Sequence, residues 1–186
     1  MDSVTSFIYG MSMMFFSMMA FLFWRKGKEM LFRMIMWLMI VVDLQLVKDM
    51  VFFLIYGFDN EHAWYLTSSL DMMIIPFYSF VLMELVKPGW FRWVKAFMLE
   101  LPFLLLPVFY IFTHNIIWFY VLSVWGAIYG CSTFILLIFM IRRYHRQLKE
   151  RFSYQENINL NWLLAILNTF FLILFLWTLS CFVINV

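Results

Sequence analysis

The chain alternates between long apolar segments and short polar stretches. The apolar segments predict six helices, at about 6–24, 34–57, 64–86, 94–113, 116–141 and 160–184. Each can cross a hydrocarbon core about 30 Å thick, because a helix rises about 1.5 Å per residue. The segments are too long and too continuously apolar for the strands of a β-barrel. The pattern therefore predicts an all-α fold: a polytopic transmembrane bundle of six helices that forms a single membrane domain over residues 1–186, with no soluble domain.

Composition supports this class and argues against several others. The chain is 66% hydrophobic and 13% charged, whereas soluble domains average about 45–50% and about 25%. Cys131 and Cys181 both lie in apolar segments, and they are too few for a disulfide framework or a zinc site. The sequence contains no phosphate-binding glycine loop, no paired histidines and no nucleophile motif. We therefore expect no enzymatic activity, no cofactor and no metal.

Lysine and arginine are concentrated in three of the polar stretches. Twelve of the 13 fall at 25–33, 87–95 and 142–151, after the first, third and fifth apolar segments. Cytoplasmic loops are the ones enriched in these residues, so the pattern predicts that these stretches face the cytoplasm and that the amino terminus is outside. The last stretch should also attract anionic lipid headgroups, and we do not expect it to contact nucleic acid directly. This predicted topology-determining basic loop contains Arg142, Arg143, Arg146, Lys149 and Arg151.

Charged residues inside the second and third apolar segments are the sharpest candidates for a site. Gln45, Lys48 and Asp49 are three and four residues apart or adjacent, which places them near one helix face. A short connection makes the two segments antiparallel neighbours, and Lys48 and Asp71 then lie about 12 Å and about 10 Å below the outer surface. The two side chains should meet. One interpretation is an ion pair that fixes helix packing; the other is a ligand-binding site or a switch that responds to proton uptake.

Two further acidic residues complete the intramembrane set. Asp43 lies on the opposite face of the second segment, where it would bond within the inner half of the bundle or line another cavity. Glu84 is expected to pair with Lys87 or Lys95 near the inner surface. Because the outer loops are short, a small or lipid-like ligand would enter within the bundle or from the bilayer. The candidate ligand-binding or switch residues are Asp43, Gln45, Lys48, Asp49 and Asp71.

Three short motifs carry a resemblance to a known family. Residues 152–163 (FSYQENINLNWL) follow a pattern of Phe-Ser-Tyr, an acidic residue, Ile, Leu and then Trp-Leu entering a helix; residues 71–76 (DMMIIP) and 84–89 (ELVKPG) add to it. The chain resembles the N-terminal multi-helix membrane sensor region of bacterial AraC-type helix-turn-helix transcriptional regulators. The resemblance implies a sensory, signal-transducing domain in the bacterial inner membrane. Six crossings would leave Val186 outside, so a cytoplasmic DNA-binding domain would require a seventh crossing.

Other functions remain open at this stage. A small transporter or channel-like protein would use the charged cluster on its pathway, and a purely structural subunit would use it for packing alone. The expected partners are the lipid bilayer, a small or lipid-like ligand and a second copy of the chain in a homo-oligomer.

Overall fold

The computed structural model describes residues 3–57 and 60–151, together with residues 165, 168, 169, 172 and 176. The regular structure in this part of the chain is entirely α-helical. The predicted helix at 160–184 lies almost wholly outside the described residues. The helices are α1 (Ser3–Lys26), α2 (Met30–Tyr56), α3 (Glu61–Asp71), α4 (Ile74–Val86), α5 (Trp93–Thr113) and α6 (Ile117–Arg151).

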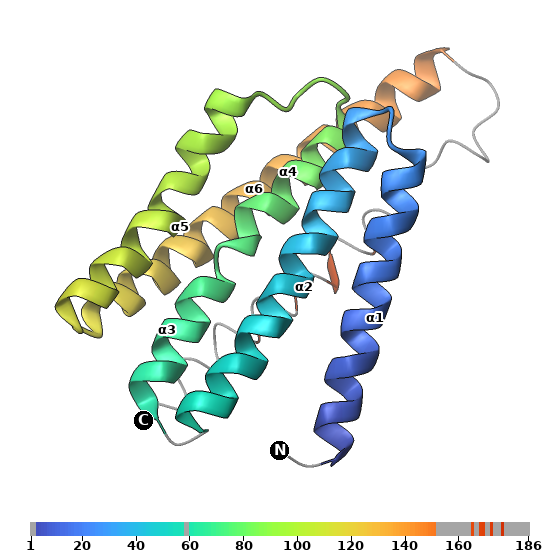
Figure 1. Ribbon diagram of the computed structural model, residues 1–186. Helices are drawn as coiled ribbons and strands as arrows, with labels where there is room; N and C mark the ends of the chain where they lie inside the picture. The colour runs from blue at the N-terminus through green and yellow to red at the C-terminus, as the bar shows by residue number, and fades with distance from the viewer. Residues whose placement is uncertain are drawn as a thin grey trace.

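The helices pack as a bundle with α4 in a central position (Figure 1). Helix α1 packs on α2, and α5 packs on α6, while α4 contacts both α2 and α6. Met34 and Leu38 of α2 pack with Phe80 of α4 in one apolar cluster. Met83 of α4 packs with Leu137 of α6 in another. Helix α4 therefore links the α1–α2 hairpin to the α5–α6 hairpin.

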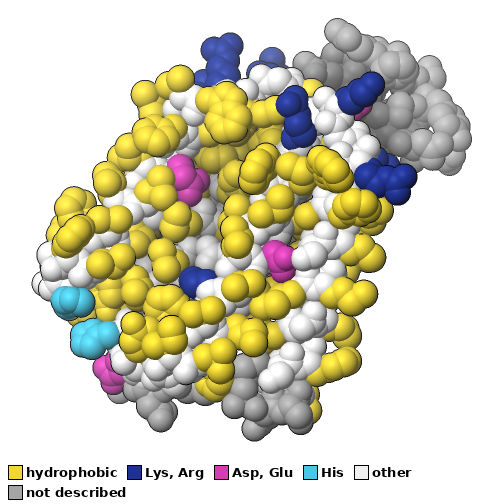
Figure 2. All heavy atoms as spheres, in the orientation of Figure 1, with side chains coloured by type: hydrophobic (Ala, Val, Ile, Leu, Met, Phe, Trp, Pro, Cys, Tyr) yellow, Lys and Arg dark blue, Asp and Glu magenta, His cyan; other side chains and the backbone are white. Residues whose placement is uncertain are grey.

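The connections of the bundle fall at two ends. The α1–α2 and α4–α5 connections and the end of α6 lie at one end, which we call the basic end; the amino terminus and the α2–α3 and α5–α6 connections lie at the other (Figure 1). Lysine and arginine side chains gather at the basic end (Figure 2). This arrangement agrees with the expectation that the three basic stretches lie on one side.

The surface of the bundle is strongly apolar, as Figure 2 shows. Large side chains such as Met14, Trp93 and Phe112 are exposed, and apolar exposure on this scale suits contact with lipid. Helix α2, which carries Asp43, Lys48 and Asp49, is not among the candidate spans. In the described part of the chain, four helical stretches are long and apolar enough to cross a membrane: Val4–Lys26, Glu61–Val86, Trp93–Thr113 and Ile117–Tyr144.

The third apolar segment, predicted as one helix, is broken. Helix α3 ends at Asp71 and α4 begins at Ile74. Across the break, the Met73 amide donates to the Leu70 carbonyl at 3.2 Å and the Ile75 amide to the Met72 carbonyl at 3.1 Å. These three-residue spacings belong to a tighter 3₁₀ turn. Pro76 contributes to the break because it has no N–H to donate to the Met72 carbonyl.

The basic run, predicted as a loop, is helical instead. Helix α6 continues through the apolar segment to Arg151. Residues 142–151 contain neither glycine nor proline, and Arg, Lys, Gln, Leu and Glu all favour helix. Arg142, Arg143 and Arg146 are exposed. The run is thus a direct extension of a helix in the bundle.

Candidate functional site

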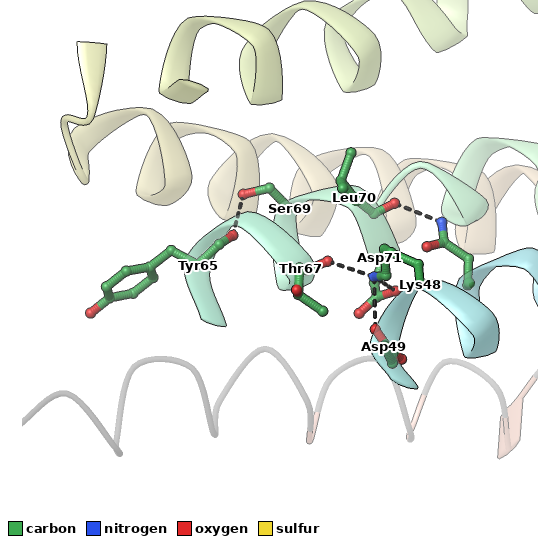
Figure 3. A network of polar contacts seen from close by, with 8 residues as sticks. Lys48, Asp49, Tyr65, Thr67, Ser69, Leu70 and Asp71 are labelled. Atoms are coloured by element: carbon green, nitrogen blue, oxygen red, sulfur yellow. Dashed lines mark hydrogen bonds and ion pairs between the residues drawn. The ribbon is translucent and has the colours of Figure 1, made fainter. Parts of the chain in front are cut away.

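Lys48 of α2 is the centre of an ionic cluster with the end of α3. Its Nζ lies 2.6 Å from Asp71 Oδ1 and 2.9 Å from Asp49 Oδ1. It also donates a hydrogen bond to the Thr67 carbonyl at 3.0 Å (Figure 3). The Lys48 side chain is 15% exposed, so the cluster lies largely inside the protein. The contact between Lys48 and Asp71 is the one that the spacing of polar residues predicts for two antiparallel neighbours.

Gln45 extends the same face of α2 by one turn. Its Nε2 donates to the Leu70 carbonyl at 2.8 Å, and this carbonyl also accepts from Met73 at the break. Lys48 and Gln45 thus both bind backbone carbonyls in the last turn of α3. The side chains of α2 hold α3 at the point where the helix ends.

A pocket opens beside the cluster, between α1, α2 and α3. Its volume is about 340 Å³, and the carboxylates of Asp49 and Asp71 line it. Lys48, which pairs with both carboxylates, is not among the lining residues. A ligand in the pocket would therefore meet acidic and aromatic groups, which suit a hydrogen-bond donor or a cation. The other lining residues with polar or aromatic side chains are Thr5, Tyr9, Phe52, Phe53, Asn60, Trp64, Thr67 and Ser68.

Asp43 lies apart from this cluster and faces α1. Its Oδ2 accepts a hydrogen bond from Ser17 Oγ at 2.5 Å. Its Oδ1 is buried and has no hydrogen-bond partner among the described residues. The contact joins α1 to α2. Sequence reasoning missed Ser17, although a polar residue in the first apolar segment of a hairpin was a usable signal.

Glu84 has different partners from those expected. The side chain is 5% exposed, and its two oxygens accept hydrogen bonds from the backbone amides of Gly89 at 2.7 Å and Phe91 at 2.8 Å. The expectation of a pair with Lys87 or Lys95 was therefore wrong. The tight turn after α4 directs two amides at the carboxylate, which satisfies both of its oxygens inside the protein.

A buried hydroxyl pair connects α4 to α6 and has no counterpart in the sequence-based set. Ser79 Oγ donates to the Pro76 carbonyl at 2.7 Å and lies 2.6 Å from the Tyr129 hydroxyl. Because the Ser79 proton is directed at Pro76, Tyr129 must donate to Ser79. Sequence spacing did not reveal this pair, since its members are fifty residues apart.

No protein-family model matches the chain, and no curated protein or solved structure matches it either. The fold and surface still define a class. This is an all-α protein with four helical stretches, in its described part, that are long and apolar enough to cross a membrane, and with an ionic cluster and a pocket inside the bundle.

Proposed function

We propose that the chain is a membrane-embedded sensory domain that binds a small ligand in the pocket beside Lys48, Asp49 and Asp71. One observation carries the proposal. Asp71 lines the pocket, pairs with Lys48 and is the last residue of α3 before the break. A ligand that competes for Asp71 would act directly on the junction between α3 and α4.

A contiguous series of contacts runs from this junction to the basic end. Helix α4 follows the break and packs on α6 through Met83 and Val86 against Leu137 and Ile141. Helix α6 then continues into the basic run. A change in the angle between α3 and α4 would therefore displace α6. Such a change transmits a signal if the ligand binds the two arrangements with different affinities.

The pocket favours one kind of ligand. Two carboxylates together with Phe52, Phe53 and Trp64 suit a small organic molecule with an amine or another hydrogen-bond donor and an apolar body. The pocket reaches Asn60, next to the α2–α3 connection and away from the basic end. Under the topology proposed next, ligand would enter from outside or from the outer part of the bilayer.

The proposal includes six crossings of the bacterial inner membrane, with the amino terminus outside and the basic end in the cytoplasm. The gathering of lysine and arginine at one end supports the orientation. Helix α2 would cross despite its charges, because Lys48 has partners on α3 and Asp43 has one on α1. The segment at 160–184 would be the sixth crossing. The motifs shared with AraC-type regulators support a role as the input part of such a regulator, with a DNA-binding domain as the cytoplasmic output.

Distance measurements between two spin labels at the basic end test the sensory function. The labels are placed at Lys28→Cys and Arg146→Cys in a variant without the native cysteines, reconstituted in nanodiscs. We expect phenethylammonium, used as the probe, to shift the distance distribution. Asp71→Asn should abolish the shift, whereas Asp43→Asn should preserve it. The sensory function is wrong if the probe binds without any shift, or if folded Asp71→Asn responds like the parent protein.

A transporter or channel is the second candidate, and the opening of a pocket beside an intramembrane ionic cluster favours it. Transport requires movement of solute across the bilayer, which signalling does not. Uptake of radiolabelled phenethylammonium into proteoliposomes separates the two functions. Uptake that Asp71→Asn abolishes would replace the sensory function, whereas binding without uptake supports it.

A further inference from the structure

A second pocket lies at the basic end, between the end of α4, the turn that follows it and α6. Its volume is about 330 Å³. It is separate from the pocket beside Lys48 and does not depend on the proposed sensory function. Six residues line it: Val86, Lys87, Trp90, Met140, Arg143 and Tyr144.

The lining combines two cations with apolar and aromatic groups. Lys87 follows α4 and Arg143 lies on α6, so two separate elements bring their positive charges to one pocket. Val86 and Met140 contribute apolar surface. Neighbouring arginines on α6, Arg142 and Arg146, are also exposed but do not line the pocket. The pocket is therefore distinguished from the basic surface around it.

The turn that carries Lys87 and Trp90 is held in place by buried contacts. Both oxygens of Glu84 accept backbone amides of this turn, and the Trp90 amide donates to the Lys87 carbonyl at 3.1 Å. Gly89 has a φ of 82°, which favours glycine. Glu84 is not among the lining residues and its oxygens are already bonded. A turn fixed in this way loses little freedom on binding, which favours affinity.

We propose that this pocket binds the phosphate group of an anionic phospholipid. Lysine and arginine donate charge-assisted hydrogen bonds to phosphate oxygens, and basic pockets between helices on the cytoplasmic side hold anionic headgroups. Trp90 and Tyr144 are the residue types that lie at headgroup level. The apolar wall formed by Val86 and Met140 favours a lipid over free phosphate, because it offers a surface for the start of the acyl chains.

Native mass spectrometry of the purified full chain tests the proposal, with phosphatidylglycerol titrated against phosphatidylcholine. We expect Lys87→Gln/Arg143→Gln to weaken phosphatidylglycerol binding roughly thirtyfold, since each basic side chain near an anionic surface contributes a factor of about five. The matched control, Arg142→Gln/Arg146→Gln, removes the same charge from outside the pocket and should change binding less than about threefold.

Three outcomes would overturn the proposal. Equal losses in the two double variants would mean that general surface charge attracts the lipid. Inorganic phosphate that binds as tightly as phosphatidylglycerol, and displaces it, would make free phosphate the ligand. If the double variant does not fold, the single variants Lys87→Gln and Arg143→Gln decide: each should lose about fivefold, and unchanged binding in both would overturn the proposal.

Discussion

Lys48 on α2 pairs with Asp71 on α3 at 2.6 Å, at the last residue of α3 before the third apolar segment breaks. The pair therefore joins three features of the molecule: the contact between α2 and α3, the wall of the pocket and the start of the 3₁₀ turn. An ionic bond in this position both holds the junction and makes it sensitive to any group that competes for the carboxylate.

The first prediction concerns the loss of this pair. Lys48→Met leaves the carboxylates of Asp49 and Asp71 without their shared cation, so we expect the free energy of unfolding to fall by about 1–3 kcal/mol. The cost should stay below the upper range for buried pairs, because the Asp71 side chain is 38% exposed. Denaturant unfolding in detergent micelles measures it.

A double-mutant cycle supplies the control for that prediction. Lys48→Met and Asp71→Asn together should cost less than the sum of the two single variants, by about 1 kcal/mol or more, because each single variant removes the same contact. Glu29→Gln is the matched carboxylate-to-amide control, since the exposed Glu29 makes no side-chain capping bond. Strictly additive effects would show that the two residues do not stabilise each other.

The second prediction uses the direction of the hydrogen bond between Tyr129 and Ser79. Tyr129→Phe removes the donor but leaves Ser79 bonded to the Pro76 carbonyl, so it should cost about 0.5–1.5 kcal/mol. Ser79→Ala instead strands the buried Tyr129 hydroxyl and removes the bond to Pro76, so it should cost about 1–3 kcal/mol. Thermal unfolding of both variants in the same detergent checks the order; a larger loss for Tyr129→Phe would mean that the donor is assigned wrongly.

The third prediction concerns the break between α3 and α4. Pro76→Ala restores an N–H that can donate to the Met72 carbonyl, so the junction should become more regular. Amide hydrogen exchange across residues 72–76 should slow, and the melting temperature should rise. Pro88→Ala, in the exposed turn after α4, is the control. Unchanged exchange in Pro76→Ala would indicate that contacts from Gln45 and Lys48 maintain the break by themselves.

The fourth prediction concerns orientation in the membrane. Single cysteines replace Lys28 and Arg146 at the basic end and Glu61 and His114 at the opposite end, in a variant without the native cysteines. A membrane-impermeant maleimide should label the last two in intact cells and the first two only after permeabilisation. The reverse pattern would place the amino terminus in the cytoplasm, and labelling of one residue from each end would contradict the proposed topology.

Part of the fold and site follows from local sequence properties. The expected helix at 94–113 corresponds closely to α5, and the expected helix at 6–24 lies within α1, because long apolar runs form helices regardless of their neighbours. The contact of Lys48 with Asp71 followed from helical periodicity and a short connection. The break after Asp71 was missed, since hydropathy is continuous across Met72 and Met73. The helical basic run was missed because a change from apolar to charged residues was treated as a helix end.

The sequence by itself determined which segments are apolar helices and that three basic stretches share one side. Both depend on the transfer of side chains between water and an apolar medium, which is a property of each segment alone. Only the tertiary structure decided which groups satisfy the buried polar atoms. Ser17 for Asp43, the amides of Gly89 and Phe91 for Glu84, and Ser79 for Tyr129 depend on which helices are neighbours and at what height they meet. The two pockets arise in the same way, because a cavity exists only between elements that have already packed.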